Sequence, residues 1–427
     1  MMPAPVRIAV YFHLLRHNPA FTRLYVAQLA SFAGDWFATV ALLGLALELT
    51  GSAAVASLVL VLQTGGFAAA APLAGILADR LDRRRLLIVA DLARVPVALG
   101  FLLAREPETL WIALVCVALL AVGAAFFEPT STAALPNLVQ PERLPEANVL
   151  IGAAWGTMLA VGAALGGVVA VYLGRDAAFL ANAASFAASA WLIYGIRRPL
   201  QADAGEGATA PARLAAGAAL RQAFQFVRGN RLVGALLLSK TTFGVGTGVV
   251  ALLAVFGSSV FGAGDAGIGL LFAARGLGAL IGPFCGRALV GTHDRGLLLG
   301  IAGSLVVLCV SYALFPLAPA LWLAAALVFS AHLGGGAQWM LSTLGLQRAT
   351  PDHIRGRLFS FDYGLVTLTI TASTLLAGVL ADSLAPAISV WAMVGLIAVA
   401  GLGWIAFARP VLRDARAPAP AADRPSA

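Results

Sequence analysis

Long apolar runs follow one another along almost the whole chain and are separated by short polar turns. Each run is near the ~20 residues that an α-helix needs to cross the ~30 Å hydrocarbon core of a bilayer. We therefore predict an all-α polytopic membrane protein with twelve transmembrane helices. Their approximate residues are 22–48, 53–78, 86–104, 109–132, 146–173, 177–196, 232–258, 265–290, 297–315, 319–346, 356–381 and 386–408.

One hydrophilic stretch, residues 197–230, separates the first six runs from the last six. The expected domains are an N-terminal six-helix bundle over residues 1–196, a cytoplasmic linker over 197–230 and a C-terminal six-helix bundle over 231–408. Residues 409–427 are rich in Pro and Ala, and we expect them to form a disordered cytoplasmic tail.

The two halves contain similar short segments at nearly the same separation along the chain. The segment PERL (141–144), before the fifth predicted helix, matches PDHI (351–354) before the eleventh. Two further matches have nearly the same spacing: Ser31 and Gly34 with Thr241 and Gly244, and Pro72 and Gly75 with Pro283 and Gly286. These matches predict two pseudo-symmetric bundles, an architecture found in transporters whose central site lies between repeats.

Composition excludes a soluble protein. Of the 427 residues, 60% are hydrophobic and only 11% are charged, whereas soluble domains carry about 25% charged residues. The net charge of +8 does not indicate a nucleic-acid partner, because the basic residues are scattered through short loops. The expected surroundings of the chain are a lipid bilayer.

The distribution of arginine predicts the orientation in the membrane. With the N-terminus inside, nearly all loop arginines fall on the cytoplasmic side, and only Arg105 and Arg175 fall on the other. Cytoplasmic loops of membrane proteins carry such an excess. We expect a multi-pass protein of the cell inner membrane with both termini in the cytoplasm.

Asp35 is the strongest candidate for proton coupling, because ionisable groups inside a bilayer are costly and mark functional sites by default. Gln28, Ser31, Asp35 and Thr39 lie on one face of the first helix, which we expect to face a substrate cavity. Counted from Arg23, Asp35 is ~18 Å along the helix, near the membrane midplane. It could take a proton from one side and release it to the other, or form a permanent structural ion pair.

Three more charged residues of the first half are candidates for proton coupling. Asp91 and Arg94 are three residues apart on one helical face and could form a local ion pair. Alternatively, Arg94 could exchange partners between Asp91, Asp35 and Glu128 as the halves move. We expect Glu128 near the cytoplasmic end of the fourth helix.

The second half supplies further candidates for the substrate cavity. Lys240 and Arg275 are the lone cations of the seventh and eighth helices, and either could face an anionic substrate or act as counter-ion to Asp35. The alternative is a pair with Asp362 of the eleventh helix. The tenth helix offers hydrogen-bonding side chains that could equally serve helix packing: Gln338 and Ser342.

A small-residue face on the fifth helix, formed by Gly162, Gly166 and Gly167, predicts close packing against a neighbouring helix. No spacing of histidines or cysteines resembles a metal site, and we expect no cofactor. The sequence contains no P-loop and no catalytic cluster of the kind that a membrane enzyme requires, which argues against ATP-driven transport and against enzymatic activity.

The loop between the second and third predicted helices reads GILADRLDRRR (75–85). It resembles the signature loop of the major facilitator superfamily, G-x-L-a-D-r-x-G-r-R/K, with Asp82 where the family usually has a second Gly. This resemblance implies a latch that locks and releases the cytoplasmic side, formed by Gly75, Asp79, Arg80, Arg83 and Arg84. The alternative is that the arginines only retain the loop in the cytoplasm.

Other segments resemble the branch of that family that contains the enterobactin exporter, macrolide efflux pumps and transmembrane secretion effectors. They are QLASFAGDW (28–36), DLAR (91–94), FEP (127–129) and RGR (355–357). The resemblance implies export by alternating access, driven by the proton gradient, and a pair between Glu128 and Arg83 in the outward-facing state. VGAALGG (161–167) departs from the Gly-Pro that antiporters of the family have in the fifth helix.

The sequence thus predicts a proton-coupled secondary transporter that exports a small amphipathic or hydrophobic compound such as a drug, macrolide or siderophore. Its expected partners are that substrate, protons and the bilayer, and we expect a monomer. Two alternatives remain open at this point. One is a gradient-independent facilitator or lipid flippase of the same fold, and the other is a non-transporting membrane sensor.

Overall fold

The structure is a computed structural model that describes residues 8–201, 216–289 and 294–414. Within these ranges the chain forms helices and no strand. Twelve of the described helical segments are long and apolar enough to cross a membrane. The predicted fold class and number of spans are therefore confirmed.

The first half contains α2 (Pro19–Thr50), α3 (Ala53–Arg80), α4 (Arg83–Leu99), α5 (Leu110–Leu138), α6 (Leu144–Tyr172) and α7 (Arg175–Tyr194). The second half contains α9 (Arg231–Gly246), α10 (Val249–Val255), α11 (Gly264–Leu289), α12 (Asp294–Leu314), α13 (Leu321–Ala349), α14 (Asp352–Ser383) and α15 (Pro386–Asp414). α9, α10 and the π-helical turn η4 (Phe256–Val260) together form one span. Short 3-10 turns join other helices: η1 (Gly100–Leu103), η2 (Pro107–Thr109), η3 (Pro141–Arg143) and η5 (Phe315–Leu317).

Local sequence signals explain where the first two spans begin and end. α2 starts after Asn18, whose side chain accepts a hydrogen bond from the Phe21 amide, and Pro19 occupies the first helical position. The same helix ends at Gly51, whose φ of 64° closes the left-handed cap. Ser52 then caps α3 by accepting a hydrogen bond from the Val55 amide.

Two short helices lie outside the predicted spans, and one predicted boundary is displaced. α1 (Ile8–His17) precedes the first span, and α8 (Ala216–Gly229) lies within the linker that was expected over residues 197–230. Both are too short to cross a bilayer, so apolar runs of spanning length do not predict them. α15 continues to Asp414, so helix replaces the first part of the tail expected from residue 409.

The helices of the two halves pack in the same order. α2 packs against α6 and α7, as α9 packs against α14 and α15. In the same way α3 packs against α5, and α11 packs against α13. Between the halves, α6 packs against α11 and α3 packs against α14. Because α6 corresponds to α14 and α3 corresponds to α11, these two contacts between the halves are equivalent to each other.

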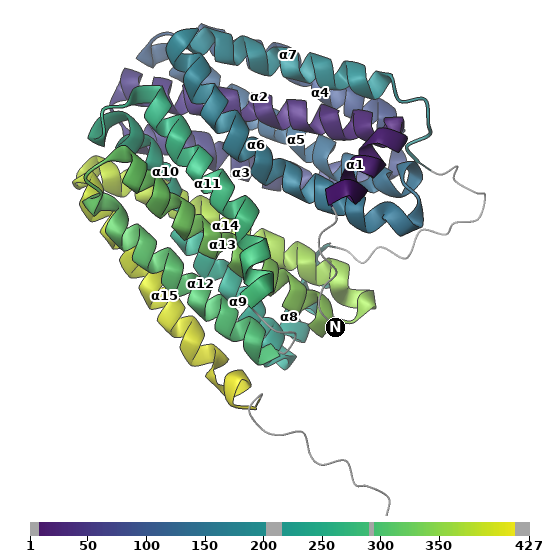
Figure 1. Cartoon of the computed structure of the whole chain (residues 1–427), viewed down its shortest axis with the longest axis vertical. Helices are drawn as coiled ribbons and strands as arrows, with labels where there is room; N and C mark the ends of the chain where they lie inside the picture. Colours follow the sequence, from purple (N-terminus) through teal and green to yellow (C-terminus); the bar gives the residue numbers. More distant parts are fainter. Residues whose placement is uncertain (1–7, 202–215, 290–293, 415–427) are drawn as a thin grey trace, which may run out of the picture.

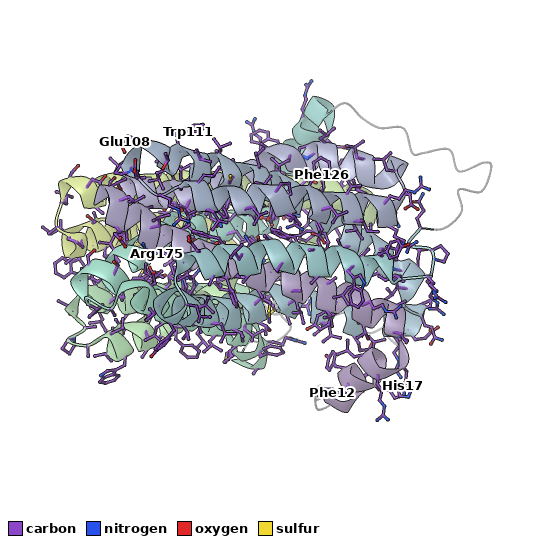
Figure 2. The ribbon with its side chains drawn as sticks, turned by 90° about the horizontal axis from the view of Figure 1, so that it is seen from above. Phe12, His17, Glu108, Trp111, Phe126 and Arg175 are labelled. Atoms are coloured by element: carbon purple, nitrogen blue, oxygen red, sulfur yellow. The ribbon has the colours of Figure 1, made fainter. Side chains whose placement is uncertain are left out.

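The halves meet mainly at one end of the molecule. Figure 1 shows them close together at the end that carries α10 and farther apart towards the end that carries α1 and α8. We call these the α10 end and the α8 end. Figure 2 shows Arg175 near the first of these ends, and Phe12 and His17 at the other.

Candidate transport site

Three acidic residues of the first half, Asp35, Asp91 and Glu128, gather around Arg94. The guanidinium group of Arg94 donates a hydrogen bond to Asp91, one turn earlier on α4, and the Asp91 side chain is 0% exposed. Nη1 of Arg94 also lies 3.9 Å from Oδ2 of Asp35 on α2. The Asp35 side chain is 29% exposed, so the Asp91 carboxylate is fully buried whereas the Asp35 carboxylate is partly accessible.

Aromatic rings and a glycine hold Arg94 in place. Its guanidinium carbon lies 4.2 Å from the ring centre of Phe186 on α7 and 5.3 Å from that of Phe127 on α5. A Cβ atom added at Gly123 of α5 would lie 2.6 Å from Cδ of Arg94. The stem of Arg94 therefore fills the space that this glycine leaves open.

Glu128 lies deeper than the sequence predicted. α5 continues through Pro129 and Pro136 to Leu138, which places Glu128 ~15 Å from that end of the helix. There it interacts electrostatically with Asp35 and Arg94.

The pair between Glu128 and Arg83 is not formed in this conformation. Nη1 of Arg83 donates instead to the backbone oxygens of Ala133, at 2.8 Å, and Leu200, at 3.3 Å. The pairing that the resemblance implied concerns the outward-facing state and stays a prediction.

Tyr363 of α14 was not among the residues that the sequence predicted for the site. It is a residue of the second half that lies close to the charged cluster of the first half. It interacts electrostatically with Glu128, and its side chain is exposed. Asp362 is buried towards the interior of its own half while its neighbour Tyr363 is exposed. The adjacent positions have opposite surroundings because successive residues of a helix point about 100° apart.

The three other polar residues on the same face of α2 as Asp35 are buried and do not face a cavity. Gln28, Ser31 and Thr39 are each at most 3% exposed. Gln28 accepts a hydrogen bond from Ser131 of α5, and Thr39 accepts one from Gln63 of α3. In this conformation Gln28 and Thr39 connect helices within the first half, and of the four polar residues on this face of α2 only Asp35 is partly exposed.

Four of the expected cavity residues in the second half are likewise internal. Nζ of Lys240 donates to Asp362, and both side chains are almost completely buried. The amide of Gln338 donates to the backbone oxygen of Ser239 and to Thr242, and Ser342 donates to the oxygen of Leu236. These contacts connect α9 to α13 and α14. They agree with the alternatives in which Lys240 pairs with Asp362 and in which Gln338 and Ser342 serve helix packing. Arg275 of α11 differs from them, because it lies where the two halves meet and is partly exposed.

Gly75, Asp79 and Arg80 belong to the last part of α3, but their surroundings lie outside what the structure describes. Arg84 donates to the oxygen of Tyr194 at the end of α7, and Arg83 donates to carbonyls of α5 and the linker. Asp82, which replaces the usual glycine of the signature loop, caps α4 by accepting a hydrogen bond from the Arg85 amide at 2.8 Å. The departure from the family pattern thus has a local structural role.

The small residues of α6 lie at two helix contacts. Cβ atoms added at Gly162 and Gly166 would meet α2, at 3.1 Å from Trp36 and 2.9 Å from Phe37. A Cβ added at Gly167 would lie 2.8 Å from the backbone oxygen of Asp265 on α11. The first two glycines thus permit packing within the first half, and the third permits contact between halves.

Ion pairs and helix caps join the halves at the α10 end. Arg175 lies 2.8 Å from Asp265 of the second half and 2.6 Å from Glu48 of the first. Asp382, at the end of α14, accepts hydrogen bonds from the Ser52 hydroxyl and the Ala53 amide, both at 2.6 Å. A carboxylate at a helix N-terminus is favourable. Sequence reasoning did not find these contacts, because their partners lie far apart along the chain.

Among the described residues, no group of three or more potential metal ligands forms. The charged cluster therefore consists of Asp, Glu and Arg side chains with aromatic neighbours. Such a set can hold or release a proton and change ion-pair partners, and it lies beside the meeting point of two similar bundles.

Comparisons with known proteins agree with this architecture. Residues 24–362 match the Major Facilitator Superfamily. The chain is 27% identical over 382 residues to the putative bacilysin exporter of Bacillus amyloliquefaciens, with 85% of this chain and 89% of the relative covered. It is 28% identical over 371 residues to the enterobactin exporter of Salmonella typhi, with 81% of each covered.

A solved structure supports the fold. A bacterial homologue of the human lysosomal transporter Spinster, inward-facing and unoccupied, matches with a TM-score of 0.72 and 15% identity. The match covers 94% of this chain and 98% of that one. Together with the matched residues and the twelve spans, these findings show that the chain is a transporter and not an enzyme, and that it belongs to the Major Facilitator Superfamily.

Proposed function

We propose that the protein is a proton-coupled secondary transporter that exports a small amphipathic or hydrophobic compound of the drug, macrolide or siderophore class by alternating access. The names of the two relatives, a putative bacilysin exporter and an enterobactin exporter, support export. We place the protein in the bacterial inner membrane with both termini in the cytoplasm, where it works as a monomer.

The observation that carries proton coupling is the unequal environment of two carboxylates around one arginine. Asp91 is sealed and hydrogen-bonded to Arg94, whereas Asp35 is 29% exposed and lies 3.9 Å from the same guanidinium group. A proton can reach Asp35 without breaking the buried pair. Protonation would remove the attraction between Asp35 and Arg94 and so loosen α2 from α4, whereas proton release would restore it.

The contacts at the α10 end support alternating access. With cytoplasmic termini, that end faces outward, and the pairs of Arg175 with Asp265 and of Asp382 with α3 close it in this conformation. The halves separate towards the cytoplasmic α8 end (Figure 1). The arrangement corresponds to an inward-facing state, in which substrate enters from the cytoplasm before export.

The test uses purified protein in liposomes with an imposed pH gradient, with enterobactin, erythromycin and bacilysin as substrates. Wild-type flux should require the gradient, and Asp35→Asn should abolish gradient-driven flux. Asp176→Asn is the matched control, since Asp176 is 51% exposed and pairs with Arg105 within the first half. Its flux should equal that of wild type.

Other results would favour the alternatives. Equal flux with and without the gradient would indicate a facilitator or a lipid flippase of the same fold. Gradient-driven flux that persists in Asp35→Asn would remove Asp35 from the coupling mechanism.

A further inference from the structure

Arg275 is a cation near the middle of the membrane that has no acidic partner among the described residues. It lies eleven residues after the start of α11 at Gly264, which places it ~17 Å along the helix and well inside a ~30 Å hydrocarbon core. Within the described part of the chain it forms no ion pair or hydrogen bond, and its Nε atom is buried without a partner. An unpaired arginine at this depth requires a compensating group.

The acids that sequence reasoning offered as partners are engaged elsewhere. Asp362 accepts the hydrogen bond of Lys240, and Asp35 lies beside Arg94. The titratable groups that interact with Arg275 are Tyr312 and His332. The Tyr312 hydroxyl and Nε2 of His332 are hydrogen-bonded to each other at 2.7 Å, and neither side chain is an anion at neutral pH.

Aromatic rings from both halves surround this cation. The guanidinium carbon lies 6.0 Å from the ring centre of Trp36 on α2, and 5.8 Å from those of Trp155 on α6 and Phe272 on α11. Cation–π contacts offset part of the loss of hydration but supply no negative charge. Arg275 and Trp36 are each partly exposed and Trp155 is 42% exposed, whereas Phe272 is fully buried.

We propose that Arg275 binds the anionic group of the transported compound, and that Trp36 and Trp155 contact its apolar or aromatic body, whereas Phe272 is fully buried behind them. Among the classes proposed above, this favours a drug or siderophore that carries a carboxylate or a similar planar oxyanion over a macrolide without an acidic group. The guanidinium fork matches such an oxyanion in two parallel hydrogen bonds. This inference rests on the proposed transport function. Because Trp36 directly follows Asp35, the anion site and the proposed proton site share one turn of α2.

Equilibrium binding to protein in nanodiscs, measured by calorimetry without a pH gradient, tests the assignment. The probes are naphthalene-1-acetate and 4-biphenylacetate, each compared with its neutral amide. Each acid should bind wild type about tenfold more tightly than its amide, or more, because a charge-assisted pair replaces a neutral contact. Arg275→Gln should reduce this ratio to about one, and Arg275→Lys should keep part of it.

Arg287→Gln is the matched control, because it removes an exposed arginine from the same helix and should leave the ratio unchanged. Thermal unfolding of each variant shows that the fold is intact. Failure of both acids to bind wild type, equal affinity of acid and amide, or an unchanged ratio in Arg275→Gln would overturn the proposal. Because no gradient is present, an acid preference that depends on Arg275 would stand even if Asp35→Asn left gradient-driven flux unaltered.

Discussion

At the scale of single residues, the buried ion pair of Lys240 with Asp362 differs in function from that of Arg94 with Asp91. Lys240 and Asp362 are both sealed inside the second half, beside the ring of Trp339 at 5.0 Å. Arg94 is shared between a sealed aspartate and an accessible one. The first arrangement fixes α9 against α14, whereas the second can respond to a proton without exposing a buried charge.

This difference predicts the effect of removing Arg94. Arg94→Gln leaves Asp91 buried without its cation, and loss of one partner of a buried pair destabilises a protein by about 3 kcal/mol. Thermal unfolding in detergent should show a clear decrease in Tm. Adding Asp91→Asn to that variant should recover much of the loss, because no isolated charge remains. A double variant as unstable as the single one would contradict this view of the pair.

The sequence predicted some of these residue contacts and not others. The pair of Asp91 with Arg94 follows from a spacing of three along one helix. The pair of Lys240 with Asp362 was one of three alternatives, because local spacing cannot choose among partners on distant helices. The aromatic surroundings of Arg275 come from three helices of both halves and have no signal in any single segment.

At the scale of helices, contact between α6 and α11 depends on small residues. A Cβ atom added at Gly276 of α11 would meet the backbone nitrogen of Ala160 and lie 2.7 Å from its Cα. A Cβ added at Gly269 would lie 2.7 Å from the oxygen of Ala163. Since a backbone cannot move as a side chain can, the two helices approach this closely only while these positions remain glycine.

Gly269→Ala, five residues after the start of α11, should therefore push the halves apart at the α10 end and favour the opposite conformation. Spin labels at Glu108→Cys and Leu317→Cys, both exposed and on different halves, would report the change as a longer distance. The native Cys116, Cys285 and Cys309 would first be replaced. Gly152→Ala on α6 is the control, because a Cβ there meets no atom within 4 Å. The same distance in both variants would contradict the steric argument.

Helix positions were largely predictable, because an apolar run of spanning length in a chain with so few charges is typical of a membrane helix. Helix ends were less so. α5 continues through Pro129 and Pro136 to Leu138, whereas the apolar run suggested an end near residue 132. This extension, which the polar residues beyond the run concealed, is why Glu128 lies near Asp35 instead of at the membrane surface.

At the scale of the whole molecule, closure at the α10 end depends on few polar contacts. Arg175 bridges the halves through Asp265, which is 8% exposed, and Asp382 accepts hydrogen bonds from the start of α3. These contacts must break for the α10 end to open. They therefore set part of the energy difference between the two conformations of the transporter.

The double variant Asp265→Asn, Asp382→Asn should favour the conformation that is open at the α10 end. Loss of these charge-assisted contacts should shift the ratio of the two states by about tenfold. The distance distribution between labels at Glu108→Cys and Leu317→Cys measures this ratio. Asp176→Asn, which disrupts an ion pair inside one half, should leave it unchanged. An unaltered distribution in the double variant would show that packing alone closes this end.

The central claim is that Asp35 couples proton movement to transport, and comparison of two transport modes in Asp35→Asn tests it most directly. Exchange of substrate across liposomes without any gradient requires the conformational change but no net proton movement, whereas uphill flux driven by a pH gradient requires both. We expect Asp35→Asn to retain exchange at a rate near that of wild type and to lose uphill flux. Uphill flux equal to that of wild type in this variant would contradict the coupling role of Asp35.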